Sequence, residues 1–306
     1  MSVAAIAMNE SLRGTLKFNE PMARHTSWRV GGVAERFYQP ADVDDLACFL
    51  RGLPPGEQVF WLGLGSNLLV RDGGLRGTVI CTSGVLGRLH VLADARIRVE
   101  AGVPCPKVAR QCAQHSLRGA EFLAGIPGTM GGALAMNAGA FGDETWNHVV
   151  SVETINARGE RFQRVPADYN VGYRTVRGPN EWFVAAVLQF EAGECAAATQ
   201  RIKELLARRA ATQPTNVPNA GSVFRNPPGD HAARLIEACG LKGYGIGGAR
   251  VSPKHANFIV NEGNATASDI EALIEHVAAT VARIHGVKLV REVRIVGEPA
   301  ATEVKR

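Results

Sequence analysis

The chain has few aromatic residues, and its cysteines are not clustered. Aromatic residues make up 6% of 306 residues, and the six cysteines contain no C-x-x-C pair. This scatter argues against a disulfide framework and against a structural zinc site, so we expect no metal and predict buried, reduced thiols. A nucleic-acid surface typically combines a basic stripe with aromatic side chains. Lysine and arginine are instead spread along the sequence, so we expect no nucleic-acid partner.

Long apolar runs are also missing. A membrane-spanning helix needs roughly 20 apolar residues, and the best run here, FVAAVLQF at 183–190, has the length of a strand. The opening residues lack a basic stretch followed by a long apolar segment, which predicts no secretory signal. We therefore expect a soluble, cytoplasmic monomer that does not bind membranes. The small net charge of +5 suits a pocket for an anionic small molecule.

Glycine, in contrast, is abundant, and many of the 34 glycines fall in three clusters at 63–74, 119–142 and 240–248. The first cluster, LGLGSNLLVRDGG, contains neither G-x-G-x-x-G nor a nucleotide-binding G-x-x-x-x-G-K-[ST] loop. Its successive amides can nevertheless converge on a phosphate oxygen. The alternative is a simple strand-ending turn. The candidate cofactor-binding residues here are Gly63, Gly65, Ser66 and Asn67.

The second cluster contains GIPGTMGGALAMNAGAFG, which we interpret as too rich in glycine for a regular element. A connection this long without helix or strand is usually functional. Small residues let the backbone lie against an extended ligand, and an asparagine adds amide hydrogen bonds. Together the two loops predict a large phosphate-bearing cofactor. The candidates in this loop are Gly125, Ile126, Pro127, Gly128, Gly131, Gly132 and Asn137.

Periodicity elsewhere predicts intermixed α and β structure. Helices are expected at about 41–52, 106–116 and 194–210, the last with Ile202, Leu205 and Leu206 on one side. Strands are expected at about 58–65, 77–83, 95–102, 149–165 and 182–190. Two prolines in TQPTNVPNAG suggest a domain boundary at 212–221.

The last third reads as a compact α+β unit. Asp230 is expected to cap a short helix that stops at Gly240. Ser268 and Glu271 form an S-x-x-E capping box before a long amphipathic helix whose apolar face runs to Ile284. Strands are expected in ANFIVN and VKLVREVRIVG, at 256–261 and 287–297.

Six motifs follow one another in the order of a known family. They are HTSWRVGG (25–32), LGLGSNLLVRDGG (62–74), GIPGTMGGALAMNAGAFG (125–142), YR (173–174), AGSVFRNP (220–227) and LKGYGIGGARVSPKHANFIVN (241–261). With them the chain resembles the UDP-N-acetylenolpyruvoylglucosamine reductase (MurB) family, also called UDP-N-acetylmuramate dehydrogenases. The resemblance extends from about residue 20 to 297.

The resemblance implies an α+β flavoenzyme of peptidoglycan precursor synthesis. Its FAD-binding region would be of the PCMH, vanillyl-alcohol-oxidase-like type with two subdomains, followed by an α+β substrate-binding domain. NADPH would reduce non-covalent FAD, and hydride would then reduce UDP-N-acetylglucosamine enolpyruvate to UDP-N-acetylmuramate. The implied divisions are an N-terminal segment (1–27), the FAD-binding domain (28–193), a helix and linker (194–217), the substrate domain (218–299) and a tail (300–306).

Three residues match the family's catalytic positions. Arg174 would hold the substrate carboxylate, or it is a surface arginine after a strand. Ser222 would donate the proton that completes the reduction, or it only satisfies its own loop. Glu292 would act protonated or through a hydrogen bond, or it pairs with Arg291 and Arg294 on an exposed strand.

Further residues lie where relatives line the substrate pocket. Asn257 is one of them, and His255 is either a pocket residue or a partly buried histidine bonded to nearby backbone. Arg208, Arg209 and Lys242 are candidates for the UDP pyrophosphate from charge alone. The implied substrate-binding residues are Tyr173, Arg225, Asn226, Lys254 and His255.

Three departures from the family pattern are visible. Val176 and Val290 stand where relatives usually have serine and glutamate, and Arg225 stands where lysine is common. No tyrosine occurs between 191 and 243, so the chain resembles the shorter, type II branch, which lacks a tyrosine-bearing lid. Two other functions stay open: an FAD-dependent oxidase of the same cofactor fold, or a non-catalytic flavin or nucleotide-sugar binder.

Overall fold

The computed structural model describes residues 12–300, which form two compact units. Unit 1 contains residues up to Lys17, 36–63 and 77–207, and unit 2 contains 18–35, 64–76 and the chain from Arg208 onward. Both units mix helices with strands. The linear boundaries expected from the sequence stay a prediction, and most of the expected tail at 300–306 lies outside the described residues.

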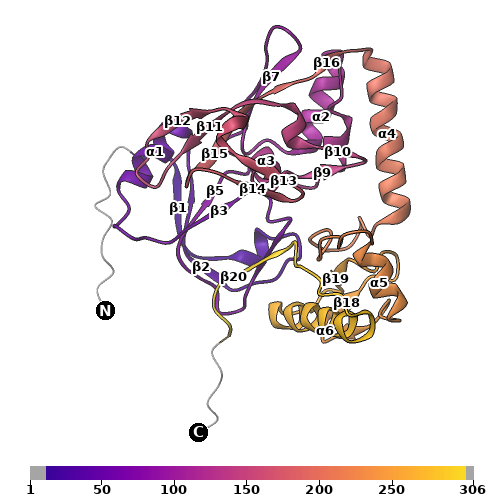
Figure 1. Ribbon diagram of the computed structural model, residues 1–306. Helices are drawn as coiled ribbons and strands as arrows, with labels where there is room; N and C mark the ends of the chain where they lie inside the picture. Colours follow the sequence, from indigo (N-terminus) through magenta and orange to yellow (C-terminus); the bar gives the residue numbers. More distant parts are fainter. Residues whose placement is uncertain (1–11, 301–306) are drawn as a thin grey trace. The chain divides into compact units, whose positions relative to one another are not determined.

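The main sheet of unit 1 has five antiparallel strands in the order β12-β11-β15-β7-β6. Its inner residues, such as Ile97, Val152 and Leu188, share one core with the apolar side of α2. Figure 1 labels this sheet beside α2 and α3. The strands are β6 (Leu89–Val91), β7 (Arg96–Glu100), β11 (Val149–Ile155), β12 (Arg161–Arg164) and β15 (Trp182–Gln189), and α2 spans Cys105–Gln114.

A second sheet has the order β1-β2-β5-β3, with β3 and β5 parallel. Helix α1 (Val43–Arg51) packs Leu46 and Leu50 into a core with Ile80 and the stacked rings of Tyr38 and Phe49, whose centroids are 3.7 Å apart. The strands are β1 (Thr15–Pro21), β2 (Val33–Gln39), β3 (Val59–Leu62) and β5 (Leu75–Cys81).

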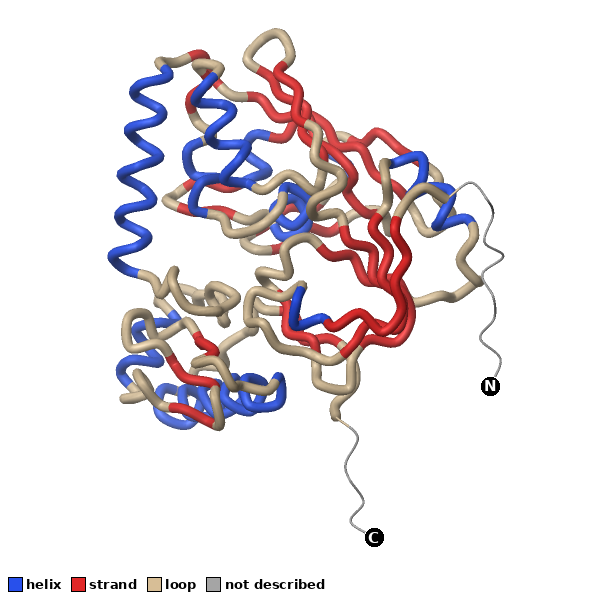
Figure 2. Tube along the Cα trace, turned by 180° about the vertical axis from the view of Figure 1, so that it is seen from behind, coloured by secondary structure: helices blue, strands red, loops and turns tan. Residues whose placement is uncertain are grey.

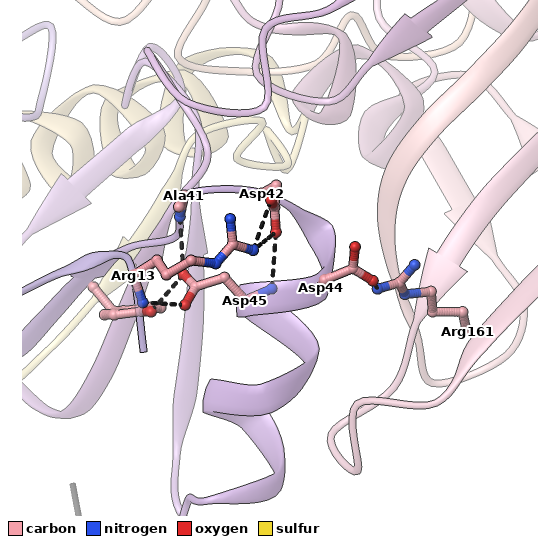
Figure 3. Close-up of polar contacts among 7 residues, drawn as sticks. Arg13, Ala41, Asp42, Asp44, Asp45 and Arg161 are labelled. Carbon is pink, nitrogen blue, oxygen red and sulfur yellow. Dashed lines mark hydrogen bonds and ion pairs between the residues drawn. The ribbon is translucent and has the colours of Figure 1, made fainter. Parts of the chain in front are cut away.

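A polar cluster fixes the start of α1 (Figure 3). The Asp42 carboxylate caps the helix by accepting the N–H of Asp45 at 2.9 Å. The Asp45 carboxylate, which is buried, accepts from the Tyr38 hydroxyl at 2.6 Å and from the backbone nitrogens of Arg13 and Ala41 at 2.7 and 2.8 Å. Helix α1 is therefore anchored to β2 and to the chain before β1.

The glycine-rich segment differs from the expected irregular loop. It contains the 3-10 turn η2 (Glu121–Gly125), the buried helix α3 (Met130–Met136) and strand β9 (Gly139–Ala140). Helix α3 forms despite its glycines because close packing requires them: a Cβ on Gly131 would lie 2.9 Å from the Cβ of Ala101. Tertiary packing thus overrides the low helix propensity of glycine.

Helix α4 (Cys195–Thr212) begins in unit 1 and ends in unit 2. It buries Ile202 and Leu205, whereas Leu206, expected on the same side, is 37% exposed. The remaining turns are η3 (Thr145–His148) and η4 (Pro166–Asp168), and the small strand pairs are β8 (Leu117–Arg118) with β16 (Glu191–Ala192), β9 with β10 (Asp143–Glu144), and β13 (Asn170–Gly172) with β14 (Thr175–Arg177).

Unit 2 packs two helices with a three-stranded antiparallel sheet, β17-β18-β19 (Figures 1 and 2). Its core joins Trp28 and Leu69 to Phe224, Leu235 and Ile274. Strand β20 pairs in parallel with β4. The elements are η1 (Met22–Arg24), β4 (Leu68–Val70), α5 (Ala232–Ala238), β17 (Gly245–Ile246), β18 (Ala249–Val251), β19 (Ile259–Asn261), α6 (Ala267–His285) and β20 (Arg294–Val296).

The expected capping box of α6 is wrong by two residues. Thr266 and Asp269 form it, because Ser268 and Glu271 have other partners. The Ser268 hydroxyl donates to Asp72 at 2.7 Å, and Glu271 accepts two hydrogen bonds from the guanidinium of Arg71, at 2.7 and 2.8 Å.

Other local expectations also need correction. Asp230 does not cap α5, which begins after His231; its carboxylate accepts from the His231 N–H and pairs with Arg234. Ile284 is 48% exposed although it was assigned to the apolar face of α6. The expected C-terminal strand is shorter, since β20 begins only at Arg294.

The cysteines are free, as expected, but only half are buried. Cys81, Cys105 and Cys112 are buried, whereas Cys195 is exposed. Burial raises the pKa of the Cys105 thiol to about 12, so this group is neutral and unreactive near pH 7. No helix within residues 12–300 is both long enough and apolar enough to cross a bilayer.

Candidate functional site

The first glycine cluster begins in unit 1 with Gly63, at the end of β3. A Cβ on Gly63 would lie only 2.4 Å from Oγ1 of Thr129, the residue that precedes α3. This hydroxyl is buried and has no hydrogen-bond partner within residues 12–300. Gly132, on the first turn of α3, leaves the same hydroxyl open, with its ideal Cβ 3.9 Å away. Unit 1 therefore contains an unused buried hydroxyl beside glycines of both predicted loops.

The remaining predicted residues of the first cluster belong to unit 2. Gly65 has a φ of +61°, and a Cβ there would lie 2.0 Å from the carbonyl oxygen of His25, so only glycine fits. Ser66 follows it. Asn67 donates through Nδ2 to the Glu292 carbonyl at 3.2 Å, and its own carbonyl accepts from Arg294 at 3.1 Å. The loop is thus fixed to the chain around β20.

In the second cluster, Asn137 supports its own segment. It is buried in the left-handed region with a φ of 45° and ends α3. Its Nδ2 donates to Glu144 at 2.7 Å and its Oδ1 accepts the N–H of Trp146 at 3.1 Å. Of the other predicted residues, Gly125 ends η2, and Ile126, Pro127 and Gly128 lie in the connection between η2 and α3.

The guanidinium of Arg174 contacts the same glycine-rich segment. Arg174 occupies the two-residue turn between β13 and β14 with a φ of 53°, a conformation that costs a non-glycine residue roughly 1–2 kcal/mol. Its guanidinium donates to the carbonyls of Asn137 at 3.3 Å and Gly139 at 2.8 Å. Tyr173 is 48% exposed, and the guanidinium carbon lies 5.4 Å from the centre of its ring. A strained, fixed arginine of this kind suggests a functional demand.

Ser222 belongs to unit 2, in a loop that its neighbours hold. Gly221 before it has a φ of +73° and its N–H donates to Asn219 at 2.9 Å. After it, the N–H of Val223 donates to the Asn257 carbonyl at 2.9 Å. Within the described residues, these bonds use backbone groups and an asparagine side chain. They do not use the hydroxyl of Ser222, which is half-buried and available to a ligand.

Glu292 is joined to the serine loop through the backbone. Its N–H donates to the Val223 carbonyl at 2.8 Å, and the N–H of Arg225 donates to the Val290 carbonyl at 2.9 Å. Glu292 precedes β20 and is half-buried, so the expected position on a strand is not observed. Unit 2 therefore brings two of the three predicted catalytic residues together, and the third, Arg174, is in unit 1.

The predicted substrate residues after Ser222 differ in their availability. The Nε of Arg225 is buried and has no hydrogen-bond partner among residues 12–300. Asn226 is exposed, and its Oδ1 accepts the N–H of Ala232 at 3.1 Å, at the start of α5. Arg225 thus has donor capacity for an anion, and Asn226 has a structural contact as well.

Lys254 and His255 follow β18 in unit 2. The ammonium of Lys254 donates to the carbonyl of Ala210 near the end of α4. Burial lowers the pKa of His255, and its Nδ1 is buried and has no hydrogen-bond partner within the described chain. Of the three cations considered for the pyrophosphate, Lys242 is paired with Glu237 at 2.7 Å, and burial lowers the pKa of Arg209.

Comparison with known proteins places this geometry in a family. Residues 34–163 match the model of an FAD binding domain, and residues 213–296 match the C-terminal domain of UDP-N-acetylenolpyruvoylglucosamine reductase. A reductase of that name from Methylococcus capsulatus is 63% identical over 94% of this chain and 95% of its own length. The chain belongs to the UDP-N-acetylenolpyruvoylglucosamine reductase (MurB) family.

Two further MurB relatives agree with this. The UDP-N-acetylenolpyruvoylglucosamine reductase of Nitrosococcus oceani is 61% identical over 95% of the chain and 98% of its own length. The crystal structure of UDP-N-acetylenolpyruvylglucosamine reductase from Thermus caldophilus matches with a TM-score of 0.80 at 30% identity, over 93% of this chain and 99% of that one. The fold class expected from the sequence, an FAD-binding PCMH-type region plus a MurB C-terminal domain, is confirmed.

The residues of unit 1 fit the FAD that this family implies. A buried hydroxyl without a partner, at Thr129, needs a polar ligand group, because leaving it unsatisfied costs about 1–3 kcal/mol. The adjacent Gly63 and Gly132 carry no side chain that would cover that hydroxyl. These residues would hold a polar, phosphate-bearing group at the start of α3.

Sequence reasoning missed Thr129 and gave Asn257 a different role. Thr129 lies inside the quoted glycine-rich motif, and the small-residue pattern drew attention to its neighbours instead. Asn257 was assigned to the substrate pocket, but it is 3% exposed and both ends of its side-chain amide bond the backbone of Phe224. The isolated asparagine gave no signal of this contact, which joins residues 33 positions apart.

Proposed function

We propose that the chain carries out the reaction of its family, the NADPH-dependent reduction of UDP-N-acetylglucosamine enolpyruvate to UDP-N-acetylmuramate. The observation that carries this proposal is 63% identity with a UDP-N-acetylenolpyruvoylglucosamine reductase across nearly the whole chain. The absence of a tyrosine from 191–243 favours the shorter branch of that family. We expect the protein to work as a monomer in the cytoplasm.

FAD, when bound, supplies the hydride that it first receives from NADPH. Gly63, Thr129 and Gly132 are the residues of unit 1 that would hold it, and Gly65, Ser66 and Asn67, which follow Gly63 in the first glycine cluster, stay candidates. The chain's own contribution is to bind the substrate, to stabilise the charge that develops on it, and to deliver one proton. Fixed donors achieve such stabilisation best when they face the developing charge.

Arg174 holds the substrate carboxylate. Addition of hydride to the terminal methylene leaves negative charge on the adjacent carbon, delocalised into this carboxylate as an enolate. A planar guanidinium offers two parallel donors, and its attraction strengthens as the charge grows. The contacts of the guanidinium with the Asn137 and Gly139 carbonyls support this role, because they fix its direction before substrate binds.

Ser222 donates the proton to the carbanion. A serine hydroxyl is a weak acid, but a carbon enolate is a strong base, so the transfer is favourable once the two atoms are aligned. Glu292, linked to the serine loop through Val223, acts in its protonated form or through a hydrogen bond. Arg225 has a buried Nε without a partner in the described chain, which suits it to an anionic group of the substrate.

The flavin spectrum tests this function. The purified protein should be yellow, bleach with NADPH and regain its colour with UDP-N-acetylglucosamine enolpyruvate. Ser222→Ala should leave bleaching intact and slow the return of colour by about 10²–10⁴-fold, the usual contribution of a positioned acid. A colourless protein that does not retain added FAD would refute the proposed function, and unchanged reoxidation in Ser222→Ala would remove Ser222 from it.

A further inference from the structure

A single asparagine, Asn257, holds the two residues that follow Ser222, one through its side chain and one through its backbone. Oδ1 of Asn257 accepts the N–H of Phe224 at 3.0 Å, and Nδ2 donates to the Phe224 carbonyl at 2.8 Å. The backbone carbonyl of Asn257 accepts the N–H of Val223 at 2.9 Å. Asn257 thus satisfies three backbone groups within two residues of the serine.

The chemistry of this contact requires a carboxamide. Both backbone groups of Phe224 need partners, one acceptor and one donor, and the carboxamide of asparagine supplies them on two separate atoms. The contact is dry, since Phe224 and Asn257 are 2% and 3% exposed. Water cannot readily replace the amide in such a place, so its removal leaves polar backbone groups unsatisfied.

The serine lies between a glycine turn and this fixed point. Gly221 has a φ of +73° and its N–H donates to Asn219 at 2.9 Å, while Ala220 before it is buried in the core of unit 2. On the other side, the Val223 carbonyl accepts the Glu292 N–H at 2.8 Å. Val223 and Phe224 are therefore held from two sides, and the direction of the Ser222 hydroxyl depends on them.

We propose that Asn257 is the positioning residue of Ser222: its side-chain amide fixes the backbone of Phe224, and with it the serine loop, so that the hydroxyl is aligned for proton delivery. This inference rests on the proposed function, in which Ser222 is the proton donor. Asn257 does not touch the substrate, because its amide is used on the protein. A displacement of about 1 Å at a reacting group can cost roughly 10²-fold in rate.

The test compares Asn257→Ala with Asn261→Ala. Asn261 is a matched control: it is 5% exposed and also bonds backbone groups in unit 2, donating to the Trp28 carbonyl at 2.9 Å and accepting from Gly263 at 2.8 Å. In the FAD-loaded enzyme, we expect Asn257→Ala to be reduced by NADPH at the normal rate. Its kcat for reoxidation by the enolpyruvyl substrate should fall about 10²-fold with little change in KM.

The control should reoxidise at the normal rate, and equal rates in the two variants would overturn the inference. If Asn257→Ala does not fold, Asn257→Leu serves instead, since it keeps the size but offers Phe224 neither a donor nor an acceptor. Asn257→Leu should show the same selective loss of reoxidation; normal reoxidation would overturn the inference.

A Ser222→Ala background separates this inference from the proposed function. Adding Asn257→Ala to Ser222→Ala should slow reoxidation little further, because the group that Asn257 aligns is already missing. A full additional loss would show that Asn257 acts elsewhere and would overturn the inference, while the effect of Ser222→Ala alone would still support the proposed function. Normal reoxidation in Ser222→Ala alone would instead refute the proton-donor role itself.

Discussion

Replacing Asp45 by alanine should destabilise unit 1 strongly, because this carboxylate serves three donors. Its side chain accepts the Tyr38 hydroxyl at 2.6 Å and the backbone N–H groups of Arg13 and Ala41 at 2.7 and 2.8 Å (Figure 3). Asp45 is 2% exposed and Tyr38 is fully buried. Water therefore cannot replace the Asp45 carboxylate as the hydrogen-bond partner of the Tyr38 hydroxyl.

The magnitude follows from how each donor fares without the carboxylate. An unsatisfied buried hydroxyl costs about 1–3 kcal/mol. The two backbone N–H groups lie near the surface, where water replaces their partner in part, so each loses roughly 0.5–1 kcal/mol. The sum for Asp45→Ala is about 2–5 kcal/mol, a large part of the stability of an ordinary domain, which is about 5–15 kcal/mol.

Two neighbouring aspartates on α1 calibrate the measurement. Asp44→Ala removes a pair with Arg161 in which the aspartate side chain is 78% exposed, and we expect no measurable change. Asp42→Ala removes the N-cap hydrogen bond to the Asp45 N–H, which should cost about 1 kcal/mol. The expected order of destabilisation is therefore Asp45, then Asp42, then Asp44.

Urea unfolding followed by far-ultraviolet circular dichroism measures this order, provided that the slope of the transition is unchanged. Tyr38→Phe supplies a double-mutant cycle: Asp45→Ala should cost about 1–2 kcal/mol less in that background, since the hydroxyl it strands is already gone. Equal urea midpoints for Asp45→Ala and Asp44→Ala would refute the reasoning.

Three further outcomes are expected. Although burial opposes ionisation of Asp45, hydrogen bonds lower its net pKa below the ordinary ~3.9. The stability that this carboxylate adds is therefore present above about pH 4 and lost as the pH falls through the folded-state pKa. In a titration of the urea midpoint against pH, Asp45→Asn should flatten this loss of stability at acid pH. Gly63→Ala would place its Cβ 2.4 Å from the Thr129 hydroxyl, so FAD should be lost on gel filtration while the circular dichroism is unchanged, and full flavin content would contradict the fit. Arg71→Lys loses the two-point contact with Glu271 and should lower the free energy of unfolding by about 1–2 kcal/mol. An unchanged free energy of unfolding would show that this ion pair does not contribute to stability.

Much of the local structure was predictable from sequence because it depends on nearby residues. Helix α1 (Val43–Arg51) lies within the helix expected at about 41–52. Strands β11 and β12 both lie within the stretch expected as strand at about 149–165, and the chain turns between them at 156–160. In both cases the pattern and the contacts that satisfy it lie within a few residues of each other.

The errors arise where distant residues intervene. Ser268 and Glu271 fit the capping-box pattern, but Asp72 and Arg71, almost 200 positions earlier, bind them. The role of Asn257 could not be predicted for the same reason, because its amide bonds the backbone of Phe224, 33 positions earlier. Helix α3 was missed because glycine has a low helix propensity. Its glycines are needed where the helix packs closely against other segments of the same chain, as Gly131 does against Ala101. For the site, motif order identified the family, but no motif could reveal that Asn257 is internal or that the Thr129 hydroxyl is unsatisfied.

The composition of unit 2 from three separate stretches has a consequence for biosynthesis. The indole of Trp28 donates to the carbonyl of Ile259 at 2.8 Å, a partner 231 residues downstream. An emerging polypeptide must therefore carry Trp28 without its partner until almost all of the message has been read. Such late, non-local closure slows folding and exposes apolar surface to aggregation in the interval. For the same reason, a fragment from Arg208 onward would lack Trp28 and Leu69, so the natural unit of expression and truncation is the entire chain.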